Sequence, residues 1–375
     1  MIAALLIAGL LPSVQEPPEK AAEFARGLET AVAKGELITF DLALDPDAFY
    51  DRVVGATKLT PSVVRFLKPV IRTTFTSTPI FAVLKGQLNY KFLKVRKTDD
   101  GFRALFRMTG ENATFNYHEL LVVPDQDGFK VVDYFVLNAG EFQSDLTRRI
   151  IMPSPQALKV LRELLAPTPG DFMLDYSSKD LNQLSQLFTG GQYQEALDLY
   201  YRKSAVLKKV KIAQVLHINA ARMIDQAAHQ KAVDDMRDVF KDEPALYIAA
   251  VGGYLQFKQL DKALEAIDRI DQTVGGDVFL NLIRARAHLQ VKDPAKARDL
   301  ARTVTEKEPK LEHGWWIRIE AHLALKEFKE VARCLSLAEK NLEVTFEDLA
   351  EEEAYAEFVK SSEYAEWLKE RGGKK

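Results

Sequence analysis

The residues with the chemistry of an active site gather in two strand-like stretches of the first half of the chain. One stretch holds Tyr117, His118 and Glu119, and the other holds Asp133 and Tyr134. Imidazole, carboxylate and phenol groups transfer protons when their pKa suits the task, so His118, Asp133 and Tyr134 are the candidates for general acid–base catalysis. Alternation along a strand places Tyr117 with Glu119 on one face and His118 on the other. The sequence does not show which face is inside.

A structural role is the alternative for these residues. A lone histidine in a strand is more often a hydrogen-bonded structural residue than a catalyst. Arg103 and Arg107 share a face of a neighbouring strand and could hold an acidic ligand, although exposure to solvent is the commoner fate of such a pair. The sequence therefore assigns no catalytic residue and leaves His118, Asp133 and Tyr134 as candidates only.

Other chemical motifs are incomplete in this sequence. It contains no Gly-rich phosphate loop, nucleophile elbow or HExxH helix. His288 and His322 occupy equivalent places in adjacent repeats, but two ligands without a third make a poor metal site. We expect no metal and no cofactor. The single cysteine, Cys334, stands beside Leu335 on a predicted helix, which favours a buried, unreactive thiol.

The length and charge of the chain limit what it can be. With 375 residues, two domains are expected. A formal net charge of -3 gives no general attraction to nucleic acid, so we expect no nucleic-acid partner. A single cysteine excludes an intramolecular disulfide framework, and stability must come from packing.

The chain begins with "MIAALLIAGLLPSVQ", an uncharged apolar run of signal-peptide length, followed by the acidic "EPPEK". We interpret residues 1–17 as an export signal, although no Lys or Arg precedes the run and no small-x-small motif marks a cleavage site. The expectation is a periplasmic or secreted bacterial protein, and the alternative is a cytoplasmic protein with a hydrophobic tail. No other stretch approaches the ~20 apolar residues of a membrane helix, so no span is expected after signal removal.

The second half of the chain carries an internal repeat anchored on small residues 34 positions apart, with two looser copies in front. The anchors are Ala196, Ala232, Ala263, Ala297, Val331 and Ala365. A 34-residue period with a small residue at the crossing of two helices resembles the tetratricopeptide repeat, or TPR. Pro244 and Pro309 stand twelve residues after two anchors, where that family ends its second helix.

The resemblance implies a helical solenoid that holds a protein or peptide partner along the first helix of each hairpin. The corresponding positions are Ile248, Leu255, Leu282, Leu289, Trp316 and Leu323, with Gln256, Arg286 and Gln290 as polar guides. Gly252, Arg286 and Glu320 stand where chaperone-docking members have a central asparagine, which argues against chaperone docking. The alternative is that these side chains pack within the stack or against the first domain.

The first half begins with helical patterns and continues with alternating strands, separated by the turn sequences "TDDG", "TGEN" and "DQDG". This order predicts an α+β domain with helices packed on one face of a curved antiparallel sheet. It resembles the cystatin-like cone of the nuclear transport factor 2 and SnoaL-like superfamily. The superfamily includes ketosteroid isomerases, polyketide cyclases and modules without catalysis, and such a cone also offers a surface for a homodimer.

Together these patterns predict four segments. They are a signal peptide at 1–17, a cone-like domain at 18–152, a linker with a short helix at 153–172, and an all-α TPR-like domain with C-terminal capping helices at 173–375. The predicted function is a non-catalytic, exported scaffold for protein–protein interaction. The alternative is an enzyme or small-ligand binder that acts through the cone, with the repeats as a recruitment module.

Overall fold

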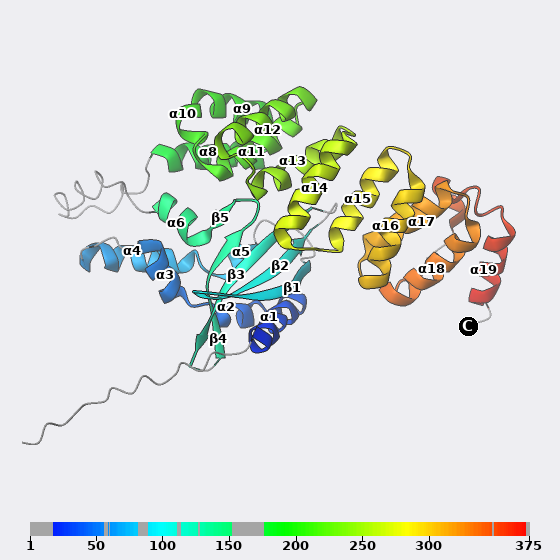
Figure 1. The fold of residues 1–375 in the computed structure, drawn as a ribbon, viewed down its shortest axis with the longest axis horizontal. Helices are drawn as coiled ribbons and strands as arrows, with labels where there is room; N and C mark the ends of the chain where they lie inside the picture. The colour runs from blue at the N-terminus through cyan, green and yellow to red at the C-terminus, as the bar shows by residue number, and fades with distance from the viewer. Residues whose placement is uncertain are drawn as a thin grey trace, which may run out of the picture. The chain divides into compact units, whose positions relative to one another are not determined.

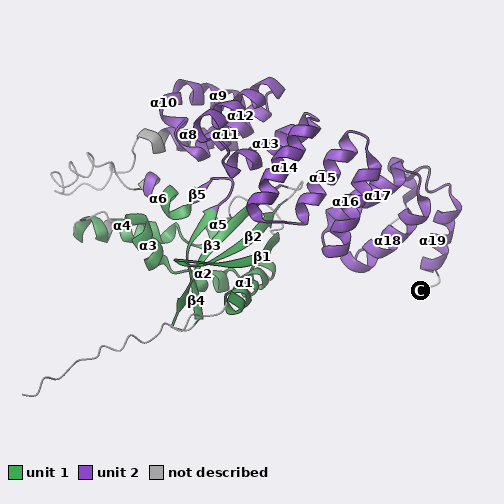
Figure 2. Ribbon diagram, viewed as in Figure 1, with its two compact units in different colours: residues 1–110, 117–135, 142–147 green, residues 111–116, 136–141, 148–375 purple. Residues whose placement is uncertain are grey.

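The computed structural model describes residues 18–55, 59, 61–81, 89–110, 114–126, 128–151, 176–346 and 349–372. These residues form two compact units (Figure 2). The first unit contains the described residues up to Gly110 together with Tyr117–Phe135 and Phe142–Thr147. The second unit contains the other described residues. The predicted signal peptide, 1–17, and the predicted linker, 153–172, lie outside the described residues.

The first unit begins with helices and continues with strands. The helices are α1 (Pro18–Ala33), α2 (Leu37–Ala43), α3 (Pro46–Val54), α4 (Pro61–Thr73) and α5 (Ser77–Phe81). There follow β1 (Asn89–Thr98), β2 (Gly101–Thr109), β3 (Phe115–Asp125), β4 (Gly128–Val136), β5 (Glu141–Phe142) and α6 (Gln143–Ile151). The five strands form one sheet in sequence order (Figure 1). The helices and the small antiparallel sheet agree with the predicted α+β class, whereas the cone shape stays a prediction.

The turn between β1 and β2 requires glycine. The two strands are antiparallel, and Thr98 pairs with Gly101 at the end of the hairpin. Gly101 has φ +137°, and a Cβ atom there would lie 2.5 Å from the carbonyl oxygen of Val122 in β3. Only glycine fits this close approach, so the glycine of "TDDG" determines where β1 ends and β2 begins.

Aromatic rings join the helices of the first unit to its sheet. Phe49 of α3 stacks on Phe75 with ring centroids 4.1 Å apart, and Phe75 lies 6.1 Å from Tyr134 of β4. Tyr90 of β1 stacks on Phe106 of β2 at 4.5 Å. All five rings are buried. The space between helices and sheet is therefore occupied by side chains at these positions.

The second unit is a tandem array of helical hairpins (Figure 1). Its helices up to α14 are α8 (Tyr176–Thr189), α9 (Tyr193–Arg202), α10 (Ser204–Leu207), α11 (Lys211–Arg222), α12 (Gln226–Phe240), α13 (Pro244–Gln256) and α14 (Leu260–Val274). There follow α15 (Phe279–Gln290), α16 (Pro294–Lys307), α17 (Glu312–Ala324), α18 (Phe328–Leu342) and α19 (Ser362–Gly372). The helices α14, α16 and α18 begin at intervals of 34 residues, which is the period of the sequence repeat.

The repeat anchors lie in the core of the array, with one exception. Five of them are 0% exposed, namely Ala196, Ala232, Ala263, Ala297 and Val331. Small side chains at these positions let two helices approach closely, as the repeat pattern requires. Ala365 differs, because it is exposed on α19 while its neighbours Tyr364 and Trp367 are buried. The repeat phase is lost after α18, where the chain forms 3₁₀ turns.

The C-terminal cap is one helix preceded by short turns. The 3₁₀ turns η2 (Leu349–Glu351) and η3 (Glu353–Tyr355) lead to α19. Leu349, Phe358, Tyr364 and Trp367 form a buried cluster with residues of α17 and α18, whereas Leu368 is 43% exposed. The C-terminal segment therefore packs on α17 and α18 with a single α-helix among the described residues, whereas capping helices were expected.

Four of the hairpin turns, but not the turn between α11 and α12, contain one residue with a left-handed backbone. In the first hairpin this residue is Gly191, with φ 74°. In the last three hairpins it is Lys258, Lys292 and Lys326, which are 34 residues apart and have φ values of 55°, 62° and 56°. A lysine in this conformation places its Cβ close to the following carbonyl oxygen, which costs about 1–2 kcal/mol. The three lysine turns thus contain strain that the glycine turn lacks.

We predict that Lys292→Gly stabilises the protein, because glycine adopts this conformation without a steric penalty. The free energy of unfolding should rise by about 0.5–1 kcal/mol after the greater flexibility of unfolded glycine is subtracted. Arg302→Gly is the matched control, since Arg302 is exposed inside α16 and its replacement should lower stability by about 1 kcal/mol. Urea unfolding measures both, and equal losses in the two variants would contradict the argument.

Adjacent hairpins also pack closely at Gly253, a position of α13 that has no side chain. The ring of His229, from α12, lies so close to Gly253 that a Cβ atom on Gly253 would overlap it. His229 is 0% exposed. The two consecutive glycines of α13 weaken its intrinsic helix propensity, so their place in the helix is explained by packing.

We predict that Gly253→Ala destabilises the protein by about 1–3 kcal/mol, because the added methyl group overpacks the His229 site. In a His229→Ala background the same change should be neutral or stabilising, since the methyl group enters the vacated space and alanine favours the helix. A double-mutant cycle measured by urea unfolding tests this coupling. An identical loss in both backgrounds would refute it.

Candidate functional site

His118 lies in the core of the first unit among aromatic side chains. It is 2% exposed, and its ring centroid lies 5.9 Å from that of Tyr90 and 5.5 Å from that of Tyr134. Its Nδ1 has no hydrogen-bond partner among the described residues. Burial lowers the pKa of His118 to about 4. At neutral pH this side chain is an uncharged ring packed among other rings.

Asp133 is fully buried and accepts hydrogen bonds from Arg52, Ser144 and the backbone N–H of Tyr134. Its Oδ2 accepts a hydrogen bond from Nε of Arg52 at 3.0 Å and another from Oγ of Ser144 at 2.6 Å. Its Oδ1 accepts one from the backbone N–H of Ser144, in the first turn of α6. Burial raises the pKa of Asp133, while these hydrogen bonds and the Arg52 charge oppose the rise. This carboxylate ties α3 and the start of α6 to β4.

The structure brings His118 and Tyr134 together but does not add Asp133 to them. Asp133 and Tyr134 are consecutive residues of β4, so their side chains leave opposite faces of the strand. Burial raises the pKa of Tyr134 well above its ordinary value, which leaves it a neutral phenol. The three catalytic candidates therefore do not form one proton-transfer site.

The predicted solvent exposure of the arginine pair on β2 is wrong. Arg107 is 1% exposed. Arg103 donates a hydrogen bond to Asp100 at 2.9 Å, and its guanidinium carbon lies 4.6 Å from the ring centroid of Phe142. Both side chains are enclosed because both faces of β2 are covered.

Three of the buried histidines make stability depend on pH. Burial lowers the pKa to about 4 in His118, about 3 in His217 and about 4 in His229. Each binds a proton more readily in the unfolded chain, where its pKa is ~6.5, so the stability it contributes is lost as pH falls below that value. Each should cost on the order of 2 kcal/mol of folding free energy between pH 7 and pH 5.

We predict that His118→Phe reduces this loss. Phenylalanine cannot take up a proton, so the fall in unfolding free energy between pH 7 and pH 5 should be smaller by roughly 2 kcal/mol than in the unchanged protein. Urea titrations at the two pH values measure the difference. The same pH dependence in both proteins would show that His118 is not the buried neutral group described above.

The predicted partner-binding strip on the first helices of the hairpins is only partly accessible. Ile248, Leu255, Leu289 and Gln290 are half-buried, and Gln256 and Arg286 are exposed. Leu282 is 1% exposed and belongs to the core, so it does not line a groove as predicted. Its burial stabilises the stack by removing an apolar side chain from water.

The last hairpin's part of the strip is used by the C-terminal cap. The ring of Trp316 contacts that of Phe346 at 5.5 Å, and its Nε1 donates a hydrogen bond to Glu312 at 2.9 Å. Leu323 packs against the same buried cluster that contains Trp367. At this end the alternative interpretation, packing within the stack, describes Trp316 and Leu323 better.

The sequence did not predict that Arg222 would lie on the strip. The side chain of Arg222, from the end of α11, lies over Gly252 of α13, where a Cβ atom would be 2.7 Å from its Nη1. Burial lowers the pKa of Arg222. Gln256 donates a hydrogen bond to the Arg222 carbonyl oxygen at 3.2 Å. Gly252 could have indicated this contact in the sequence. A glycine on the strip has no side chain, so it leaves room for a side chain from the preceding hairpin.

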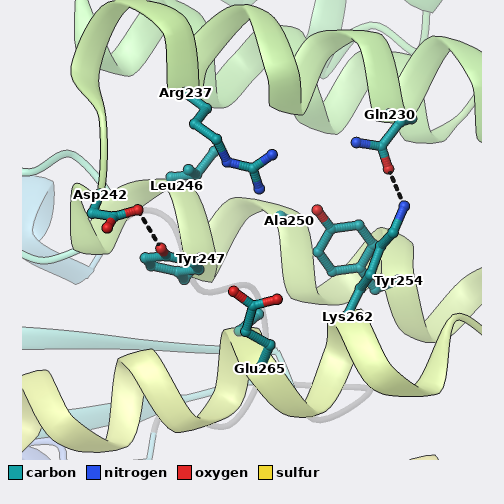
Figure 3. Close-up of a pocket in the computed structure, with 10 residues that line it drawn as sticks. Gln230, Arg237, Asp242, Leu246, Tyr247, Ala250, Tyr254, Lys262 and Glu265 are labelled. Carbon is teal, nitrogen blue, oxygen red and sulfur yellow. Dashed lines mark hydrogen bonds between the residues drawn. The ribbon is translucent and has the colours of Figure 1, made fainter.

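A pocket of about 230 Å³ lies between α12, α13 and α14 (Figure 3). Its lining includes Gln230, Arg237, Asp242, Leu246, Tyr247, Ala250, Tyr254, Lys262, Glu265 and Ala266. The residues come from three helices and from the loop between α12 and α13, and they follow no motif, so nothing in the sequence indicates this pocket beyond the positions of the helices.

The two repeat histidines bind carboxylates at the hairpin turns. Nδ1 of His288 lies 3.1 Å from Oδ2 of Asp293, and Nδ1 of His322 lies 2.6 Å from Oε2 of Glu327. No cluster of three metal-ligating side chains occurs in the part of the chain that the structure describes. Cys334 is fully buried, and burial raises its pKa to about 11.

The comparisons with known proteins found limited similarity. No family model matches this chain, and no curated protein matches it. A mutant of MamA covers 44% of this chain and 96% of its own, at 9% identity and a TM-score of 0.34. The match to TTC0263, a thermophilic TPR protein of Thermus thermophilus, covers 49% of this chain and 98% of TTC0263, at 15% identity and a TM-score of 0.34.

No helix in the described ranges combines the length and apolarity needed to cross a membrane. Likeness at a TM-score of 0.34 carries no assignment. The TPR-type architecture of the second unit therefore rests on the chain's own hairpins, with their 34-residue spacing and buried small anchors.

Proposed function

We propose that this protein is a non-catalytic scaffold that binds a protein or peptide partner along α13 and α15. The observation that carries the proposal is the strip of half-buried apolar and exposed polar side chains on these helices, represented by Ile248, Leu255 and Arg286. Tandem hairpins hold such a surface rigidly, so little order is lost on binding. Export, indicated by the N-terminal apolar run, is part of the proposal, as is a homodimer through the first unit.

The charges on the strip indicate the chemistry of the partner. Among the described residues neither Arg222 nor Arg286 has an ion-pair partner, and the pKa of Arg222 is lowered because its guanidinium is partly removed from water. A carboxylate placed beside these cations would restore the lost solvation. We therefore expect a partner segment with apolar side chains for Ile248 and Leu255 and with acidic side chains for the two arginines.

The first unit supports a non-catalytic role. His118 is enclosed by Tyr90 and Tyr134, and Asp133 is engaged by Arg52 and Ser144. A general base needs a pKa near the working pH and access to substrate. The environment of His118 provides neither, which weighs against chemistry in the cone.

A photo-crosslinker at Gln256 tests the proposal. In the native cell envelope it should form an adduct of defined mass with the partner, because Gln256 is exposed at the edge of the strip. Arg286→Glu should reduce the adduct yield by about tenfold or more, since a like charge would face the acidic segment.

The controls are a crosslinker at Arg302, on α16, and the variant Arg302→Glu. Arg302 is exposed and lies outside the strip. Neither change should affect the adduct formed from Gln256. Adducts of the same mass from both crosslinker positions, or no effect of Arg286→Glu, would reject the strip as the binding surface.

A further inference from the structure

The pocket between α12, α13 and α14 lies on a different face of α13 from the partner strip. At 3.6 residues per turn, Tyr247, Ala250 and Tyr254 are centred roughly 120° around α13 from Ile248 and Leu255. The pocket is therefore independent of the proposed partner surface. Nothing in the proposed function uses it.

The floor and side walls of the pocket are rigid. Ala250, Ala266 and Leu246 are buried and apolar. Tyr247 is 6% exposed, and its hydroxyl donates a hydrogen bond to Oδ1 of Asp242 at 2.7 Å (Figure 3). Tyr254 is 4% exposed. A ligand would meet preformed walls, so it would lose little affinity to reorganisation of the protein.

Opposite charges face each other across the pocket. Arg237 points into it from α12 and Glu265 points into it from α14 (Figure 3). Arg237 forms an ion pair with Asp234, with Nη1 3.1 Å from Oδ1, and Nζ of Lys262 donates a hydrogen bond to Gln230 at 2.7 Å, so both cations have further N–H groups to offer. Glu265 has no ion-pair partner among the described residues.

The charge balance restricts the ligand. Two cations, Arg237 and Lys262, and two anions, Asp242 and Glu265, line the pocket, so its formal charge is zero. A ligand with a single charge would be attracted by one wall and repelled by the other. A ligand with both charges at its ends would satisfy both walls. The volume of about 230 Å³ suits a molecule the size of one amino acid and not a peptide.

We propose that this pocket binds a free α-amino acid as its zwitterion. The carboxylate lies against Arg237 and Lys262, the ammonium group lies against Glu265 between the two tyrosine rings, and the side chain rests on Ala250 and Ala266. The charged side chains are exposed to solvent, so each ion pair contributes modestly and the dissociation constant should be in the millimolar range, roughly 0.1–10 mM.

Saturation-transfer NMR on the full chain tests this proposal. Leucine is the probe, with 4-methylpentanoate, which lacks the ammonium group, and 3-methylbutylamine, which lacks the carboxylate, as matched analogues. Leucine at about 10 mM should receive saturation, and each analogue should bind at least about tenfold more weakly. Glycine, aspartate and lysine then show which side chains the floor accepts.

Glu265→Gln should weaken leucine binding about fivefold or more without affecting the fold, because Glu265 is exposed. Ala266→Met should block the pocket from its floor. Glu306→Gln, an exposed change on α16, is the control and should leave binding unchanged. No saturation of any amino acid, equal binding of either analogue, or unchanged binding in Glu265→Gln would overturn the proposal, and none of these results bears on the adduct at Gln256.

Discussion

The close approach of two helices at a small, fully buried residue is the constraint on which the second unit depends. Ala263, Ala297 and Val331 are 0% exposed where the helices of their hairpins cross. A larger side chain there would push the helices apart and tilt every following hairpin, since each one packs only on its neighbours. The turns before α14 and α16 are tight, and in them Lys258 and Lys292 keep a left-handed backbone although lysine is poorly suited to it.

Two glycines of α13, which have no side chains, extend this constraint from one hairpin to the next. Gly253 admits the ring of His229, and Gly252 admits the guanidinium group of Arg222, both from the preceding hairpin. One pair of glycines thus fixes the spacing of α12 and α13 and also places a cation on the partner strip. Packing and the proposed recognition share the same residues here, so a change that improves helix propensity at Gly252 would also displace the charge.

The sequence predicted features that depend on local volume and missed those that depend on distant contacts. Period, anchors and helix starts could be predicted, because a small residue or a turn residue acts within its own hairpin. The contact of Trp316 with Phe346 depends on how the C-terminal segment returns, and that of Arg52 with Asp133 joins residues 81 positions apart. No periodic pattern in the sequence indicates either contact. The exposure of Ala365 has the same origin, because the 3₁₀ turns after α18 break the phase.

Burial sets the protonation states of the residues with the most chemical promise. Removal from water favours the neutral form of every ionisable group, so the pKa of His118 falls to about 4 while that of Tyr134 rises. Both groups are then in their neutral forms at pH 7. Exposed charges on the repeats, among them those of Arg286 and Glu265, are accessible to a ligand. These charges are consistent with the proposed recognition by the repeats.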